Sequence, residues 1–584
     1  MRIATAFLVL LLAFREAPAA EREDLAAARS LFEENIAAIR ERDRAKYLSL
    51  YLDDARLIRT GPSGFSTGFE DFAAQAGEGW PDMLEANDMR LTPVQPGVVY
   101  GTYRYRVRYG AEEHAGISER LFVRTAAGWK IALTGAIDTP PGTPPPPRAI
   151  AGGTLIDGRG GPPVKNATVI VRNGRIDCAG RCEVPPGIDV LDARGMWITP
   201  GLIDAHVHFS QTGWADGRPD ALDVRATHPY ENVQAELEAK PERFGRSYLC
   251  SGVTTVFDVG GYPWTLRLEE RLAHDTTVPR VVAAGPLLST RDHWVNLPAE
   301  RQFIHLKDET AARDGVRYLA AQGTRAVKVW YLEENGIALA AAAEEARKHG
   351  LPLIVHATEL AKAKDAVRAG AALLVHGIWD QPVDQEFLDL ARRAGTIVTP
   401  TMTVVGGYSR MYRSILDRIA PAVDDPNRCV DRATLARVAS TASLPAGRLT
   451  SDQLARREQA NAEEQRIAAA NLQALVAAGI PIATGTDAGN PLTLHGPAIY
   501  AEMEAMQRAG MTPSQVIVAS TSVAARAAGV AGETGTIEPG RAADLLIVAG
   551  DPAADVANFR KLRYVVRAGV TRSVRDLSAL ASAE

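Results

Sequence analysis

Two histidines separated by one residue end a short apolar run in the sequence GLIDAHVHF, residues 201–209. In a β-strand, residues i and i+2 project from the same face, so the side chains of His206 and His208 point together. Two imidazoles on one face make half of a metal site, because neutral imidazole is a common metal ligand. A single His-x-His pair is more often structural, so the metal hypothesis depends on further ligands elsewhere in the chain.

Four more side chains suited to such a site lie at or near the ends of other short apolar runs. Lys328 lies within RAVKVWY, His356 ends LPLIVH, His376 ends ALLVH and Asp487 follows IATGT. Each has an ordinary explanation alone, as a core histidine, a snorkelling lysine or a turn-capping aspartate. A buried unpaired ammonium is costly, however, and the coincidence of all these residues favours a shared site.

The elements that must position these residues are short strands that alternate with helices between residues 199 and 529. Eight such strands are typical of a (β/α)8 barrel, whose active sites lie at the carboxyl ends of the strands. The predicted strands span residues 197–206, 254–259, 281–285, 326–330, 353–356, 373–376, 396–400 and 481–487. Helical segments at 408–421 and 448–479 are longer than a minimal barrel needs, and we expect them to cover its mouth.

Short strands punctuated by glycine and proline flank the predicted barrel on both sides. We expect residues 149–198 and 530–584 to pair into one small β-sandwich beside a barrel formed by residues 199–529. The predicted fold class of this part is therefore α/β.

The N-terminal segment, residues 21–138, has a helical stripe that includes Leu31, Phe32 and Ile36, followed by strands of alternating polarity such as YRYRVRY. This order predicts an α+β unit. The pattern, with the strand GWKI, resembles the SnoaL-like and NTF2-like cone domains, which enclose a pocket. A proline-rich linker at residues 139–148 follows the segment.

Residues 1–20 have the features of a secretory signal peptide: Arg2, an apolar run and the small residues APAA. Cleavage is expected near Ala19 or Ala20, and an uncleaved anchor is the alternative. The run is too short for a stable membrane span, so a periplasmic or secreted protein without stable membrane insertion is expected. In that oxidising setting Cys178 and Cys182 could form a disulfide if their geometry fits.

The composition argues against nucleic acid as a partner. The chain has 584 residues, and its 65 basic and 70 acidic residues give a net charge of −5. This balance offers no basic face for nucleic acid, and the expected partner is a small-molecule substrate. Assembly into a homo-oligomer is compatible with this composition.

The ligand-bearing motifs together resemble the amidohydrolase superfamily. PGLIDAHVH, VKVW, VHA, VHG and GTDAG match its motifs in order, and GETGTIEPGRAADLLIV matches its return to the β-sandwich. The similarity covers residues 149–571 and is greatest to the imidazolonepropionase-like and Xaa-Pro dipeptidase-like branch, which binds two metals. It implies a buried metal on His206, His208 and Asp487, a more exposed metal on His356 and His376, and an N-carboxylated Lys328 that bridges both.

The resemblance also implies a reaction. A hydroxide shared by two divalent ions, zinc above all, would attack the carbonyl of an amide-type C–N bond in a dipeptide or N-acyl amino acid. Asp487 would be the catalytic residue that carries the proton to the leaving nitrogen.

Two alternative functions are considered, and two further residues are candidate substrate contacts. A mononuclear deaminase would use His356 and Glu359, and a ligand-binding protein would have an inert barrel. His293 and Tyr331 are candidate substrate contacts, because each follows a predicted strand near the barrel mouth.

Overall fold

A computed structural model of the chain describes residues 19–61, 64–76, 79–109, 112–138, 145–447 and 449–582. The chain divides between Thr143 and Pro144 into two compact units. The predicted signal peptide, except for Ala19 and Ala20 at the start of the first helix, lies outside the described residues, as do residues 139–144 of the predicted linker. No helix within these described ranges has the length and apolar character needed to cross a bilayer.

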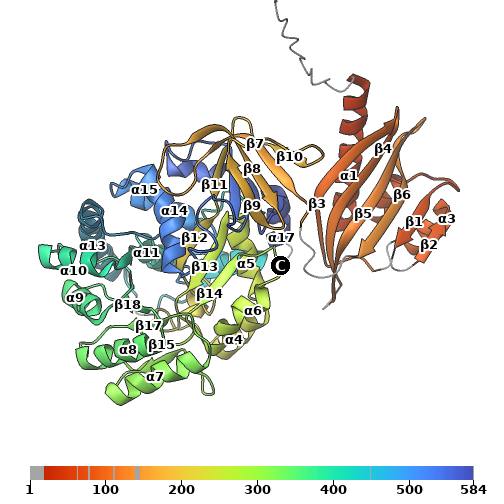
Figure 1. Ribbon diagram of the computed structural model, residues 1–584. Helices are drawn as coiled ribbons and strands as arrows, with labels where there is room; N and C mark the ends of the chain where they lie inside the picture. The colour runs from red at the N-terminus through yellow and green to blue at the C-terminus, as the bar shows by residue number, and fades with distance from the viewer. Residues whose placement is uncertain are drawn as a thin grey trace, which may run out of the picture. The chain divides into compact units, whose positions relative to one another are not determined.

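In its described residues, the N-terminal unit has a six-stranded sheet and three helices. Figure 1 shows how these elements are arranged. Its strand order is β2-β1-β6-β5-β4-β3, and the four long strands β3 to β6 pair antiparallel. The helical stripe predicted at Leu31, Phe32 and Ile36 packs against inward-facing strand residues. The elements are α1 (Ala19–Glu41), α2 (Arg44–Ser49), β1 (Ile58–Gly61), β2 (Gly64–Thr67), α3 (Phe69–Gln75), β3 (Met83–Gln95), β4 (Val98–Tyr109), β5 (Glu112–Thr125) and β6 (Gly128–Asp138).

In the second unit, both ends of the chain segment build one eight-stranded sheet, as predicted. The connection is the antiparallel pair β11 and β21, in which Ile198 lies opposite Ile547. The sheet has its own core of buried aliphatic side chains. Its strands are β7 (Arg148–Leu155), β8 (Val164–Arg172), β9 (Arg175–Gly180), β10 (Asp189–Asp192), β11 (Trp197–Pro200), β21 (Leu545–Val548), β22 (Leu562–Arg567) and β23 (Val570–Ser573).

The barrel consists of parallel strands in two groups joined by backbone hydrogen bonds. The groups are β12-β13-β14 and β16-β15-β17-β18-β19-β20. The Arg325 amide donates to the Ala283 carbonyl at 3.3 Å on one side. The strands are β12 (Leu202–Val207), β13 (Val253–Asp258), β14 (Arg280–Ala283), β15 (Leu287–Ser289), β16 (Phe303–His305), β17 (Val327–Trp330), β18 (Leu353–His356), β19 (Leu373–Val375) and β20 (Ile397–Thr399).

The last predicted strand, 481–487, is an extended segment with isolated bridges instead of a regular strand. It links β20 to β12, because the Ala483 amide donates to Val398 at 2.9 Å and the Asp487 amide donates to His206 at 2.8 Å. It therefore lies between β20 and β12, where the eighth predicted strand was expected. The short strands β15 and β16, which pair beside β17, are additional to the eight predicted strands.

The first predicted strand, 197–206, is two strands that belong to different sheets. The chain passes from β11 to β12 at Pro200 and Gly201. A Cβ atom at Gly201 would lie 2.0 Å from the Thr254 hydroxyl, so only glycine permits this close approach to β13.

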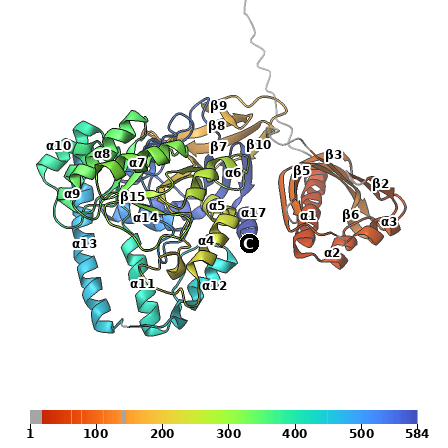
Figure 2. The ribbon, with the colours of Figure 1, turned by 90° about the horizontal axis from the view of Figure 1, so that it is seen from below.

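Helices surround the barrel strands (Figure 1). The helices α11, α12 and α13 project together from one side of this unit (Figure 2) and share an apolar cluster that includes Met411, Val438 and Leu454. The helices are α4 (Tyr230–Ala239), α5 (Glu242–Cys250), α6 (Leu268–Leu272), α7 (Glu309–Ala321), α8 (Gly336–Lys348), α9 (Leu360–Ala369), α10 (Gln385–Ala394), α11 (Val404–Asp417), α12 (Arg432–Ser440), α13 (Ser451–Ala477), α14 (Ala498–Arg508), α15 (Pro513–Ala519), α16 (Ser522–Ala527) and α17 (Val574–Ser582).

Two disulfides are present in the second unit. Cys178 and Cys182 close a short loop at β9, the pair that the sequence suggested. Cys250, at the end of α5, bonds to Cys429, 179 residues away and just before α12. The sequence analysis did not anticipate this second pair.

Candidate metal centre

The ends of the barrel strands bring six side chains to one cavity of about 210 Å³. All six candidate ligands predicted from the sequence line this cavity: His206, His208, Lys328, His356, His376 and Asp487. They come from β12, β17, β18, the end of β19 and the 481–487 segment, as expected for the carboxyl ends of barrel strands.

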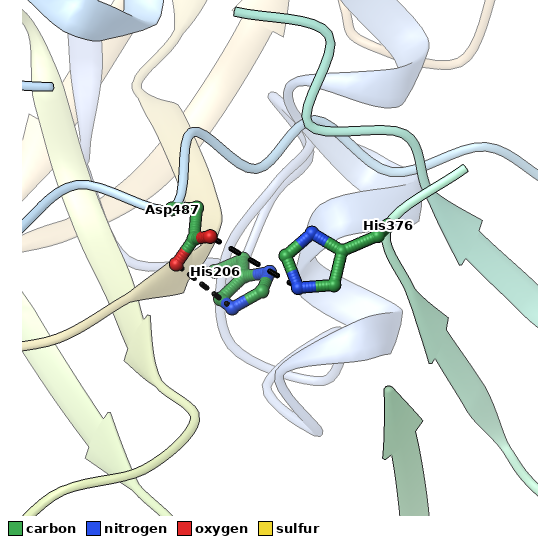
Figure 3. A group of neighbouring side chains, drawn as sticks. All are labelled: His206, His376 and Asp487. Carbon is green, nitrogen blue, oxygen red and sulfur yellow. Dashed lines mark ion pairs between the residues drawn. The ribbon is translucent and has the colours of Figure 1, made fainter. Parts of the chain in front are cut away.

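Three of these residues already form a compact group (Figure 3). The nearest ligand atoms of His206, His376 and Asp487 lie within 4.8 Å of one another. The Asp487 carboxylate lies 3.3 Å from the Nε2 atom of His206 and 3.9 Å from that of His376. A fourth member, His208, places its Nε2 atom 3.0 Å from the same carboxylate.

The backbone turns sharply at two of these residues. His376 has φ 73° and Asp487 has φ 58°, both in the left-handed region that non-glycine residues rarely adopt. Such conformations cost free energy and cluster at functional sites, where the surrounding structure imposes them. Here each lies where a strand segment ends and its side chain enters the cavity.

The contacts of His208 show that the site suits a cation. Its Nδ1 atom lies 2.7 Å from the Gly260 carbonyl, which can only accept, so Nδ1 carries a proton. In the neutral imidazole the lone pair is then on Nε2, which faces the Asp487 carboxylate. The 3.0 Å contact between Nε2 and the carboxylate is therefore favourable only when a proton or a metal ion lies between them. His495 supports this arrangement by donating from Nε2 to the His208 carbonyl at 3.1 Å.

Burial keeps the other imidazoles neutral. It lowers the pKa of His206 and of His356 well below the usual value, and that of His376 to about 4. The neutral rings offer lone pairs to a metal at pH 7. The Nδ1 atom of His206 is also buried without a hydrogen-bond partner. These nitrogens, together with a carboxylate, are a donor set that suits zinc and other divalent transition metals.

Lys328 differs from an ordinary lysine in its environment. Its side chain is 2% exposed, and burial lowers the pKa of its amine to about 7. A substantial fraction is therefore uncharged at neutral pH. An uncharged amine is the form that can add carbon dioxide and become a carbamate, an anionic ligand with two oxygens.

Two buried aspartates that the sequence analysis did not single out hold the ligand strands in place. Asp204 accepts hydrogen bonds from the amide and hydroxyl of Thr486, at 2.9 and 2.6 Å, which joins β12 to the 481–487 segment. Asp258 accepts from the amides of Phe209 and Gly260 at 2.8 and 3.0 Å. Both carboxylates lie directly beside the histidine pair of β12.

The two candidate substrate contacts do not line the cavity. The His293 ring stacks on the Trp330 ring, with centroids 4.6 Å apart. Trp330, and not His293, lines the cavity. Tyr331 is 1% exposed and lies outside the lining. The reason is strand periodicity, because Lys328 and Trp330 point to the same side of β17 and the next residue does not.

Glu359 also lies away from the cavity. It is the N-cap residue of α9, and its side chain is 49% exposed and pairs with Lys362 at 2.7 Å. This position at a helix N-terminus explains the carboxylate without a catalytic role. The geometry thus gives no support to the deaminase alternative.

The sequence analysis missed a polar part of the cavity wall beside Asp487, whose carbonyl accepts from the Asn490 side chain at 2.9 Å. Arg218, in the loop after β12, donates to Asn490 at 2.5 Å and to Asp220 at 2.8 Å. The Tyr408 hydroxyl of α11 donates to the same Asn490 oxygen at 2.6 Å. These residues come from loops and a covering helix, where no sequence periodicity reveals them, although all three of Arg218, Tyr408 and Asn490 line the cavity.

A barrel that carries histidines, a lysine and an aspartate at the carboxyl ends of its strands offers a potential metal site. Residues 197–572 match the amidohydrolase family, and the chain belongs to this family. Imidazolonepropionase of Ralstonia nicotianae is 26% identical over 427 residues, which cover 68% of this chain and 89% of that protein. Imidazolonepropionase of Caulobacter vibrioides is also 26% identical, over 68% of this chain and 90% of that protein.

Solved structures show the same fold. A Xaa-Pro dipeptidase is 21% identical with a TM-score of 0.57, and the match covers 73% of this chain and all (100%) of that one. Molinate hydrolase is 23% identical with a TM-score of 0.55, covering 74% of this chain and 96% of that one. With the family assignment, these relatives identify the chain as a hydrolase that acts on carbon–nitrogen bonds.

Proposed function

We propose that the protein is an exported hydrolase that uses two divalent metal ions, zinc above all, to cleave the amide bond of a small anionic substrate. Dipeptides and N-acyl amino acids are the substrate class. The observation that carries the proposal is the convergence of six ligand-type side chains on one cavity of about 210 Å³.

The ligands divide into two groups and a bridge. His206, His208 and Asp487 would hold one ion, and His356 and His376 the other. Lys328, as a carbamate, would span both. When bound, two such ions polarise a carbonyl oxygen and lower the pKa of water to about 7.

The chain itself moves the proton. Asp487 lies on the cavity wall, where it can take a proton from water and return it to the leaving nitrogen. The nitrogen needs this proton because an amide anion leaves too slowly. Trp330 and Trp379 complete the apolar part of the wall and limit the access of bulk water.

Arg218 supports an anionic substrate. Its guanidinium lines the cavity, with Nε and Nη2 paired to Asp220 at 2.8 Å and Nη1 bonded to Asn490. The second N–H of each Nη atom remains for the carboxylate of a substrate, and hydrogen bonds between charged groups are the stronger ones. The free carboxylate of a dipeptide or N-acyl amino acid offers that group. Export is supported by the two disulfides, which persist in oxidising compartments.

A substrate screen tests the proposal. Metal-loaded protein should release free amine from members of a set of dipeptides and N-acyl amino acids, and should cleave their carboxyl-amidated counterparts less well. Arg218→Gln should raise KM for the free carboxylates by about tenfold and remove this preference. Metal-loaded protein that releases no amine from any member would refute the proposal and favour a binding role.

A further inference from the structure

The N-terminal unit contains a cavity of its own, with a volume of about 430 Å³. Its lining comes from α1, α2, α3, the segment between α3 and β3 that contains Trp80, and residues of the sheet, all within this unit. The volume lies in the range of about 300–1,000 Å³ that is typical of small-molecule sites. The metal centre uses none of these residues.

One side of the cavity is aromatic. The ring of Tyr47 stacks on that of Phe72, with centroids 5.8 Å apart, and meets the edge of Trp80 at 5.4 Å. All three line the cavity. Flat aromatic faces of this kind favour a planar apolar group in a ligand.

The inner end of the cavity carries a positive charge. Arg120, on β5, is 4% exposed, whereas His114 and Asp138, which also line the cavity, have side chains that are 44% and 42% exposed. The exposed pair therefore marks the mouth, and Arg120 lies at the opposite, buried end.

No carboxylate neutralises Arg120 within the part of the chain that the structure describes. Its guanidinium donates to the Ser118 hydroxyl at 2.7 Å, the Glu119 carbonyl at 2.9 Å and the Tyr103 hydroxyl at 2.9 Å. Its Nε atom is buried and has no hydrogen-bond partner. A buried charge is costly unless an opposite charge compensates it, so this arrangement suits an anionic ligand.

The neighbours of Arg120 also offer donors. The Tyr103 hydroxyl accepts a hydrogen bond from the guanidinium, so the proton of this hydroxyl remains available for a ligand. Burial raises the pKa of the nearby Tyr47 phenol well above its usual value, so that phenol also keeps its proton. Ser118 uses its proton on the Gly135 carbonyl at 2.5 Å. The inner end thus presents the guanidinium of Arg120 and the O–H of Tyr103, donors that match the two oxygens of a carboxylate.

We propose that this cavity is a second binding site, which takes a small aromatic carboxylate. The carboxylate lies on Arg120 and Tyr103, and the ring lies against Tyr47, Phe72 and Trp80. This inference is independent of the proposed amide hydrolysis, because it rests on the other unit. The competing explanation is structural, with Arg120 stabilised by the face of the Tyr103 ring 5.2 Å away.

Isothermal titration calorimetry on the full mature chain tests the proposal with 2-naphthoate and its neutral isostere 2-naphthamide. The carboxylate should bind at least about tenfold more tightly than the amide, because hydrogen bonds to an ionised group are the stronger ones. Arg120→Gln should abolish this difference. The matched control Arg56→Gln, at an arginine whose side chain is 80% exposed, should bind like the parent protein.

One further variant, together with the ligand comparison on the parent protein, keeps the test decisive if Arg120→Gln does not fold. Tyr103→Phe removes only one donor and should weaken naphthoate binding several-fold without affecting naphthamide. The comparison of the two ligands needs no variant at all. Equal affinity for both ligands, no detectable binding of naphthoate, or unchanged naphthoate binding in a folded Arg120→Gln protein would each overturn the proposal.

Discussion

Lys328 is the residue whose chemistry is hardest to explain without a metal. It lies on β17, which pairs with β15 and β18, and its buried side chain lines the cavity, where an ammonium has no lone pair to offer a metal. As a carbamate it becomes an anion that can bind two cations. Lys328→Ala should therefore lose at least one metal ion per chain and most activity, and short carboxylic acids should restore part of it.

The control for this prediction is Lys362→Ala. Lys362 is also buried, at 9% exposure, but pairs with Glu359 outside the cavity. It should keep metal and activity, as measured by elemental analysis and amine release. A fully active Lys328→Ala protein would show that the lysine is no ligand.

Asp487 joins metal binding to proton transfer. Asp487→Asn keeps the shape of the side chain but cannot shuttle a proton, so kcat should fall by roughly 10²–10⁴ while the remaining ligands retain much of the metal. Steady-state kinetics with metal analysis measures both effects. Glu359→Gln is the matched comparison and should be close to the parent. If Glu359→Gln were the inactive variant instead, the proton carrier would be Glu359.

At the level of elements, the long disulfide connects the segment before α12 to the barrel helix α5. Breaking it with Cys250→Ala and Cys429→Ala should lower the free energy of unfolding by about 2–4 kcal/mol, because it closes a long loop in the unfolded chain. The Cys178–Cys182 bond spans only 4 residues, so the equivalent alanine pair should cost less. Urea unfolding of both double variants measures the difference, and equal losses would contradict the argument.

The strands and the convergence of the six candidate residues on one cavity could be predicted because each signal is local. Short β-branched runs such as LIVH and VKVW specify buried parallel strands, and each ligand lies in or directly after its run. Periodicity could not show that the chain changes sheets at Pro200 and Gly201. Nor could it show that residues 481–487 make too few regular pairs to form a strand.

Features that depend on contacts between distant segments escaped the sequence analysis. Cys250 and Cys429 are brought together only by the folded covering helices. Arg218 comes from a loop, and its place on the cavity wall depends on Asn490, 272 residues away. The sequence analysis expects Tyr331 near the barrel mouth because it follows the strand of Lys328. Strand alternation instead places Trp330 on the cavity wall, on the same side of β17 as Lys328.

At the scale of the whole molecule, the candidate metal site lies entirely in the second unit. The six candidate ligands lie after Pro144, and the second unit has its own core and closes its sheet with its own C-terminal strands. A truncated protein that begins at Arg148 should therefore bind metal and keep measurable kcat. A folded, metal-loaded but inactive truncation would show that the N-terminal unit contributes to the reaction.

The most direct test of the central claim is the number of metal ions bound at the barrel mouth. Crystals of metal-loaded protein, measured at the absorption edge of zinc, should show two anomalous peaks. One should lie among His206, His208 and Asp487 and the other beside His356 and His376, with density beyond the Lys328 Nζ atom reaching both. A single peak with an unmodified lysine, or no peak in this cavity, would contradict the account.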